Sequence, residues 1–201
     1  MPKIVNHDKR REQLAEAAWR VIRREGLEGV TVRSVADEAG MSLGSLRHYF
    51  VTQSELLAFS MRMVSDRVNQ RIAKLPFNGV PRHDIELVIR EIMPLDEERL
   101  AESEVWISFT GRAMVDPTFR ALSLEVHESL YEGFRRMINV LIQLKLTDEG
   151  IDAELETRRL HALVDGLVIH SITNAERHDP DEMWRVVMLH LDQLIVNEYK
   201  P

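Results

Sequence analysis

The stretch that decides the fold is Thr31-Val-Arg-Ser-Val-Ala-Asp-Glu-Ala-Gly40-Met-Ser-Leu-Gly-Ser-Leu-Arg-His-Tyr-Phe50. It is typical of two short helices joined by a turn at Gly40, because only glycine adopts a positive φ angle at low cost. Thr31 and Ser42 are residue types that cap helix N-termini, and each stands directly before a run with helical spacing. In the second helix, Leu46 and Phe50 are four residues apart and are predicted to face the core.

The exposed face of this second helix carries groups suited to DNA. Arg47 can pair with guanine or phosphate, Ser45 and Tyr49 can donate hydrogen bonds, and Gly44 permits a close approach to the DNA backbone. Two helices joined by a glycine turn form a helix-turn-helix, whose second helix enters the major groove. The alternative is an ordinary pair of bundle helices, but such a helix rarely gathers these residue types on one short face. The predicted DNA contacts are Thr31, Arg33, Ser42, Leu43, Gly44, Ser45, Arg47, His48, Tyr49 and Gln53.

Apolar spacing predicts further helices on both sides of this unit. Upstream, an apolar stripe from Leu14 to Ile22 indicates a helix that Gly26 ends. Downstream, a helix begins at Thr52 or Ser54, and no segment alternates like a strand. Further helices are predicted at about 83–92, 96–114, 118–145, 152–176 and 181–198. We therefore expect an all-α chain of about nine helices, with an N-terminal three-helix DNA-binding domain at 1–52 and a C-terminal helical bundle at 53–201.

The composition narrows the class of protein. The chain has 201 residues, of which 44% are hydrophobic and 29% charged, a balance typical of globular proteins. It has no cysteine, which excludes disulfides, a cysteine nucleophile and a thiolate zinc site. No apolar run approaches the ~18 residues of a membrane span, and the basic residues near the N-terminus precede no apolar run, unlike those of a secretory signal. We expect a cytoplasmic protein with no membrane partner.

The charge is distributed unevenly along the chain. The net charge is −7, which argues against a protein that coats nucleic acid along its whole surface. Residues 1–50 hold nine Lys and Arg against seven Asp and Glu, while residues 51–201 hold seventeen against twenty-six. This pattern favours a protein that touches phosphate with its N-terminal part only.

Over residues 8–60 the sequence resembles the TetR family of bacterial regulators, at many positions in fixed register. The resemblance implies a transcription regulator, in particular a repressor that binds a palindromic operator in double-stranded DNA as a homodimer. It also implies a small-molecule effector that binds in the C-terminal bundle and releases the DNA. The matching elements are the apolar stripe of the first helix, the Gly26 loop, Thr31-Val32, Val35-Ala36, Ala39-Gly40-Met41-Ser42, Gly44-Ser45-Leu46, His48-Tyr49-Phe50 and Glu55-Leu56-Leu57.

Two positions depart from the family pattern. Arg47 stands where the family usually has an aromatic residue, and Gln53 stands where it usually has lysine. Arg47 could supply a phosphate or guanine contact, whereas Gln53 removes one cationic phosphate partner. We expect DNA affinity to fall less steeply with salt than in relatives. A salt slope that indicates about eight or more phosphate contacts per dimer would contradict this hypothesis.

The family resemblance also suggests roles for residues of the bundle. The last two predicted helices carry apolar stripes, which face either a partner subunit or the chain's own core. The predicted dimer contacts are Leu160, Leu163, Leu167, Val187, His190 and Leu194. Aromatic and thioether side chains line adaptable apolar pockets, although any one of them can instead be ordinary core. The candidates for the pocket wall are Trp106, Phe109, Met114, Phe134, Met137 and His170.

An enzyme is a competing hypothesis. The dipeptides His83-Asp84 and His178-Asp179, and the pair His161 and Asp165 at i, i+4, could hold a divalent metal as in a helical hydrolase. Solvated helix caps and a local helical pair are the commoner explanations of these residues, and the chain lacks a glycine-rich phosphate loop and a serine elbow. We therefore predict no catalytic residues, metal site or cofactor. A DNA-bound activator or adaptor protein is the other alternative, because its N-terminal DNA-binding domain would have the same sequence features.

Overall fold

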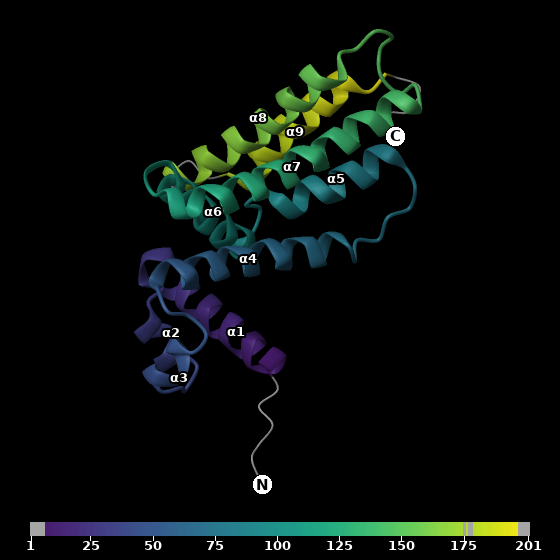
Figure 1. Ribbon diagram of the computed structural model, residues 1–201. Helices are drawn as coiled ribbons and strands as arrows, with labels where there is room; N and C mark the ends of the chain where they lie inside the picture. Colours follow the sequence, from purple (N-terminus) through teal and green to yellow (C-terminus); the bar gives the residue numbers. More distant parts are fainter. Residues whose placement is uncertain (1–6, 175, 177–178, 197–201) are drawn as a thin grey trace. The chain divides into compact units, whose positions relative to one another are not determined.

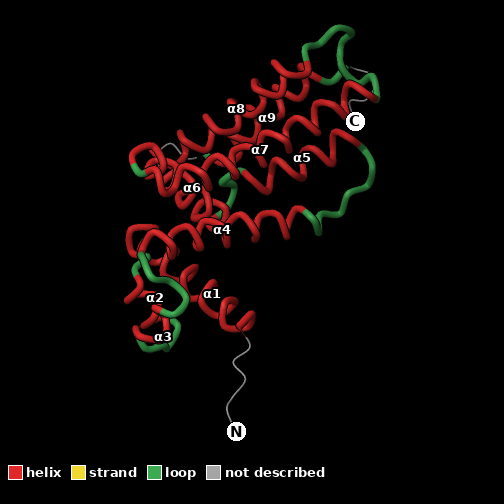
Figure 2. Tube along the Cα trace, in the orientation of Figure 1, coloured by secondary structure: helices red, strands yellow, loops and turns green. Residues whose placement is uncertain are grey.

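The structure is a computed structural model that describes residues 7–174, 176 and 179–196. In these residues the regular elements are all helical, which confirms the all-α prediction (Figure 2). Residues 175, 197 and 198, which two predicted helices included, lie outside the described residues. The elements are α1 (His7–Glu25), a 3-10 turn (Leu27–Gly29), α2 (Val32–Glu38), α3 (Leu43–Arg47), α4 (Gln53–Ile72), α5 (Pro81–Ile92), α6 (Glu97–Val115), α7 (Pro117–Gln143), α8 (Ala153–Thr173) and α9 (Pro180–Leu194).

The helix ends follow from local sequence. Gly26, with φ 70°, ends α1 as predicted. Pro81 and Pro180 stand in the first turns of α5 and α9, where the missing N–H of proline costs no helical hydrogen bond. Asp152 caps α8 and Asp179 caps α9, each carboxylate accepting hydrogen bonds from two backbone N–H groups. Glycine, proline and aspartate residues therefore mark the end of α1 and the starts of α5, α8 and α9.

The chain packs into two compact units. Unit 1 holds the described residues up to Arg67 together with Glu104–Leu122, and unit 2 holds Val68–Ser103 and the described residues from Ser123 onward. Helices α4, α6 and α7 each contribute residues to both units. The predicted domain boundary after residue 52 stays a prediction, because compact packing does not reveal which segments fold independently.

Unit 1 is built around α1, which packs against α2, while α2 packs against α3 (Figure 1). The apolar stripe predicted for α1 is buried from Leu14 to Ile22. Arg20 and Arg24 join α1 to α2 through ion pairs of 2.6 and 2.9 Å with Glu38. The hydrogen bonds from the two guanidinium groups hold the pKa of Glu38 below its usual range. The first two helices are thus joined by apolar packing and by paired charges.

Unit 2 contains charged groups in its interior. Arg71 on α4 donates to Glu91 on α5 at 2.8 Å and to Glu102 on α6 at 2.6 Å, and both carboxylates are buried. Arg99 also pairs with Glu91. Although burial favours the neutral carboxyl, the hydrogen bonds from Arg71 and Arg99 lower the pKa of Glu91. This network ties three helices together within unit 2.

Among the described helices, none combines the length and the apolar character that crossing a bilayer requires.

Candidate nucleic-acid interface

The N-terminus of α2 is fixed by a reciprocal cap. The hydroxyl of Thr31 accepts from the backbone N–H of Ser34 at 3.0 Å, and the hydroxyl of Ser34 accepts from the backbone N–H of Thr31 at 2.9 Å. The Ser34 hydroxyl also donates to the carbonyl of Gly29 at 2.6 Å. Thr31 therefore caps α2, as predicted, and its half-buried side chain holds the helix start in place.

The turn between α2 and α3 requires glycine for its backbone angle. Gly40 has φ +63°, and a Cβ atom added there would meet no other atom within 4 Å. The restriction is therefore conformational and not steric. Ser42 then caps α3, its hydroxyl accepting from the N–H of Ser45 at 3.1 Å. Helix α3 ends at Arg47, which is shorter than the predicted run to Phe50, because the backbone tightens into a turn there.

Burial sorts the residues of α3 into two faces. Leu46 is fully buried and Phe50 is 7% exposed, which confirms their predicted core positions. The ring of Phe50 packs against that of Phe59 with 4.9 Å between centroids. On the other face the side chains are exposed, except that Tyr49 is half-buried. The exposed residues are Leu43, Gly44, Ser45, Arg47 and His48.

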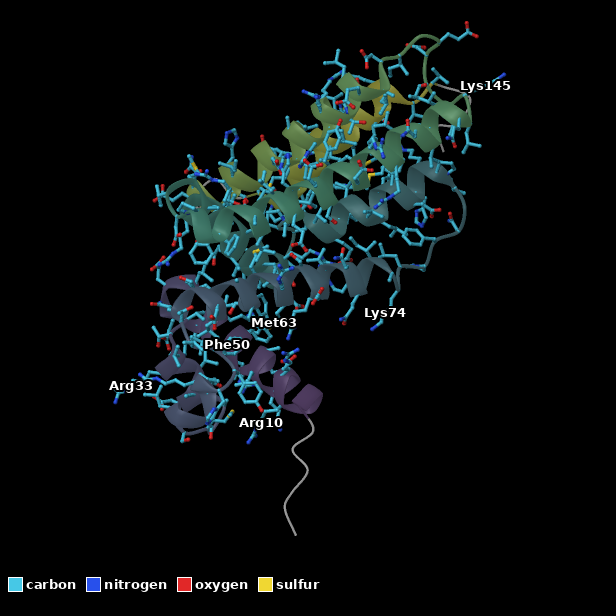
Figure 3. The ribbon with its side chains drawn as sticks, viewed as in Figure 1. Arg10, Arg33, Phe50, Met63, Lys74 and Lys145 are labelled. Carbon is cyan, nitrogen blue, oxygen red and sulfur yellow. The ribbon has the colours of Figure 1, made fainter. Side chains whose placement is uncertain are left out.

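Helices α2 and α3 each carry one arginine that is open to solvent. Arg33 on α2 and Arg47 on α3 are exposed, and among the described residues neither forms an ion pair. Figure 3 shows Arg33 extending away from the head. Arg20 and Arg24 differ, because both are paired with Glu38. Within α2 and α3, Arg33 and Arg47 are thus available to contact phosphate or guanine.

Gly44 and Gln53 have different surroundings. A Cβ atom at Gly44 would come no closer than 3.9 Å to the Ser42 hydroxyl, so packing within the chain does not require glycine there. The Gln53 amide donates to the carbonyl of Val30 at 3.3 Å, which links the start of α4 to the loop before α2. Thr52 caps α4, accepting from a backbone N–H at 3.1 Å. Gln53 therefore links α4 to the loop before α2, and it is also exposed to solvent.

Two family profiles match this chain, one over its N-terminal part and one over its C-terminal part. The profile described as bacterial regulatory proteins of the tetR family matches residues 14–68. The profile described as the C-terminal part of a BetI-type transcriptional repressor matches residues 81–196. The chain belongs to the TetR family. A curated TetR-family relative of similar length is the HTH-type transcriptional regulator PksA of Bacillus subtilis (strain 168), which is 40% identical over 199 residues. The match covers 98% of this chain and 96% of PksA.

Solved structures of transcriptional regulators share the fold of this chain. A transcriptional regulator from Rhodococcus sp. Rha1 is 29% identical, with a TM-score of 0.77 over 92% of this chain and 95% of that one. A transcriptional regulator from Saccharomonospora viridis, solved in complex with choline, has the same fold with a TM-score of 0.80 at 20% identity, over 94% of this chain and 100% of that one. This TetR-family chain is a DNA-binding transcriptional regulator, and we call its helices α1 to α3 the head.

The predicted pocket wall is divided between the two units of the TetR-family chain. Trp106, Phe109 and Met114 belong to unit 1, where Phe109 is fully buried against Phe119 and Met114 is 78% exposed. The other three candidates belong to unit 2, and they are the buried Phe134, the half-buried Met137 and the exposed His170. These six residues do not line one described pocket, so the effector site stays a prediction.

The predicted dimer contacts of this regulator lie largely inside unit 2. Four of the six are already covered by their own chain, and only Leu163 and Leu167 are half-buried. Large exposed apolar side chains stand nearby on the same two helices, which are Leu155 and Ile169 on α8 and Val186 and Leu189 on α9. The covered residues are Leu160, Val187, His190 and Leu194.

The candidate metal dipeptides have other roles in this TetR-family structure. The Asp84 carboxylate accepts from the backbone N–H groups of Asn78 and Gly79 at 3.0 Å each, which stabilises the turn before α5. Asp179 caps α9, and its neighbour His178 lies outside the described residues. His83 is exposed. Neither dipeptide therefore forms a metal-binding arrangement within the described residues.

The helical pair of His161 and Asp165 lies in a surface pocket of about 410 Å³ within unit 2. Nε2 of His161 is 3.3 Å from Oδ2 of Asp165. Sequence spacing found this pair but missed His127 on α7, which completes the group. The available signal was that His127 precedes the predicted inward residue Phe134 by seven positions, two turns along one helix face.

Proposed function

We propose that this regulator is a homodimeric repressor that binds a palindromic operator through α3 and is released by a small-molecule effector. The observation that carries the proposal is the division of α3 between a buried Leu46 and an exposed polar face with an unpaired Arg47. Such a short helix gains its stability from one face and leaves the other free for the major groove. The description of the C-terminal profile as a BetI-type repressor supports repression.

A dimer explains the apolar side chains that α8 and α9 expose. Leu155, Ile169, Val186 and Leu189 are each more than a third exposed, and isolated chains rarely leave several large apolar residues on neighbouring helices. We expect these residues, together with Leu163 and Leu167, to contact the partner. A dimer is also what a palindrome requires, since its two recognition helices must reach half-sites about 34–36 Å apart.

Leu189→Glu tests the dimer, because Leu189 is 59% exposed in the single chain and its substitution should leave the fold intact. A charge buried without a partner is costly, so we expect the variant to sediment as a monomer at concentrations where the wild type is a dimer. Leu124→Glu is the matched control, because Leu124 is equally exposed but lies on α7. Monomeric behaviour of both variants, or of neither, would contradict this interface.

The release step would be a shift between two conformations. Helix α4 carries residues of both compact units, so a change in the bundle that moves α4 would also move the head. An effector acts in this way only if it binds the form that does not fit DNA more tightly. Choline, which the Saccharomonospora viridis regulator binds, is a reasonable first compound for a release assay. We propose no catalytic role for the chain, and we place its action in the cytoplasm.

The decisive experiment selects bound sequences from a random DNA pool and then measures affinity at several salt concentrations. We expect a palindrome, and we expect Arg47→Ala to weaken binding to it by about 1–3 kcal/mol per contact. Arg135→Ala is the control, because Arg135 is an exposed arginine of α7 that pairs with Glu132. Failure to enrich any sequence, or equal losses in the two variants, would contradict sequence reading by α3.

Repression is tested separately in cells. A reporter placed behind the selected palindrome should be expressed more strongly when the regulator is deleted. Lower expression after deletion would identify an activator and would leave the DNA-binding proposal intact.

A further inference from the structure

The group formed by His127, His161 and Asp165 has the composition of a metal site. The three residues each offer one ligand atom, and these atoms all lie within 4.8 Å of one another. His161 and Asp165 stand one turn apart on α8, and His127 comes from α7. Two ligands from one helix and a third from another is how helical bundles build metal sites.

His161 provides a second, independent observation. Its side chain is 6% exposed, and Nε2 has no hydrogen-bond partner among the described residues. Oδ2 of Asp165 is 3.3 Å from Nε2, but this contact does not form a hydrogen bond. A buried ring nitrogen without a partner is rare in a native protein, because it has lost water without replacement. A bound cation would satisfy it.

The surroundings of His161 hold its ring in a fixed orientation. The Phe134 ring stacks on it with 4.9 Å between centroids and 29° between planes. The exposed His127 ring lies beside it and is tilted, with 5.0 Å between centroids and 31° between planes. Packing of this kind limits the rotamers of a ligand, which lowers the cost of binding an ion.

The pocket also favours a cation electrostatically. Its lining includes the carboxylates of Glu128, Glu154 and Asp165 and a single cation, Arg158. Arg158 is already paired with Glu154 at 2.9 Å. The formal charge of the lining is therefore negative while the two histidines are neutral, and neutral imidazole is the form that binds metal.

We propose that His127, His161 and Asp165 bind one divalent transition-metal ion of the Zn²⁺ type on each chain. Two imidazole nitrogens and one carboxylate oxygen suit Zn²⁺, Co²⁺ or Ni²⁺, whereas Mg²⁺ and Ca²⁺ prefer oxygen ligands. Ligand atoms around such an ion lie at most about 4 Å apart. The exposed His127 has room to close the remaining distance by rotating. Water would complete the coordination, as in other three-ligand sites.

This inference goes beyond the proposed function and does not depend on DNA binding. Its test uses the full-length protein, freed of metal by a chelator and titrated with Zn²⁺ in a calorimeter. Co²⁺ then serves as a spectroscopic probe, since its visible absorption reports nitrogen and oxygen ligation. We expect one Zn²⁺ per chain and displacement of Co²⁺ by Zn²⁺.

Variants separate this site from adventitious binding to the other histidines of the chain, which has eight in all. His127→Gln changes an exposed ligand and should leave the fold intact, and we expect it to weaken Zn²⁺ binding by tenfold or more. Asp165→Asn should weaken it similarly. His83→Gln is the control, because His83 is an exposed histidine of unit 2 outside the group. Absence of binding to the wild type, or equal affinity in His127→Gln and His83→Gln, would overturn the proposal.

Discussion

In the head, Arg33 and Arg47 are exposed to solvent without acidic partners, whereas Arg71 and Arg82 in unit 2 form ion pairs with carboxylates. The side chain of Arg82 is only 9% exposed and contacts Asp192 at 2.7 Å. Arginine is therefore left exposed and unpaired at these two positions of the head, where Arg20 and Arg24 pair with Glu38, whereas Arg71 and Arg82 stabilise the fold of unit 2. Exposure and pairing distinguish the two uses, and the charge alone does not.

The strongest way to test this contrast is to remove the interior cation. Arg71→Met leaves the buried Glu102 without its partner, and breaking such a pair costs about 3 kcal/mol or more. We expect a loss of about 3 kcal/mol in the free energy of unfolding, measured by urea denaturation at fixed protein concentration. Arg47→Ala should leave that free energy unchanged while it weakens DNA binding. If both variants lost equal stability, the division between the two regions would be wrong.

Gly40 and Gly44 allow a second comparison within the head, between a glycine that the fold requires and one that the DNA contact would require. Gly40→Ala forces alanine into a positive φ angle, which should reduce the free energy of unfolding by about 1–2 kcal/mol. Gly44→Ala meets no close atom and should stabilise α3 by about 0.5–1 kcal/mol, yet weaken DNA binding if the backbone must approach closely. Thermal unfolding and DNA titration of the two variants check both expectations. Unchanged DNA affinity in Gly44→Ala would show that its missing side chain is not part of the interface.

The smallest expected effect is the pH dependence of the free energy of unfolding that arises from the buried His190 in unit 2. Burial lowers the pKa of His190 and outweighs the Glu156 carboxylate, whose oxygen is 3.1 Å from Nε2. The folded state then binds fewer protons than the unfolded state, so unfolding takes up a proton as the pH falls. We expect the free energy of unfolding to decrease below about pH 6.5, above the range where carboxylates titrate.

Urea denaturation between about pH 7 and 5, with a chelator present, measures this dependence. His190→Gln should reduce the slope, and His83→Gln, at an exposed site, should not. A slope that is the same in all three proteins would assign the effect to other groups.

Sequence reasoning succeeded where the determinants are local. Thr31, Gly40 and Ser42 fix the ends of α2 and α3 through contacts within a few residues, so their spacing was enough to locate the helices. The buried positions of Leu46 and Phe50 followed from helical periodicity. Resemblance to the TetR family rested on these same positions, which is why the class of protein could be predicted from the head alone.

The features that the sequence did not predict depend on contacts between residues that are far apart in the chain. Arg71, Glu91 and Glu102 lie on three helices, and no pattern in the sequence predicts that they meet. His127 is similarly remote from His161 along the chain. An apolar stripe on α8 or α9 also does not say which residues its own chain covers, so the predicted dimer contacts fell largely on buried positions. Packing between helices, and not propensity, decides such questions.

The composition of unit 1 has a consequence for how this kind of protein can be recombined. Its residues come from two separate parts of the chain, and Glu104–Leu122 stand nearly forty positions beyond Arg67. Phe109 and Phe119, which pack edge to face in the second part, belong to the same unit as α3. A chimaera that exchanges only the N-terminal segment between two relatives would combine it with Glu104–Leu122 of the other relative, and contacts such as Arg112 with Glu28 would then join residues from two different proteins. An exchange of genes between relatives that keeps unit 1 intact must therefore also transfer Glu104–Leu122, or select compensating changes within it.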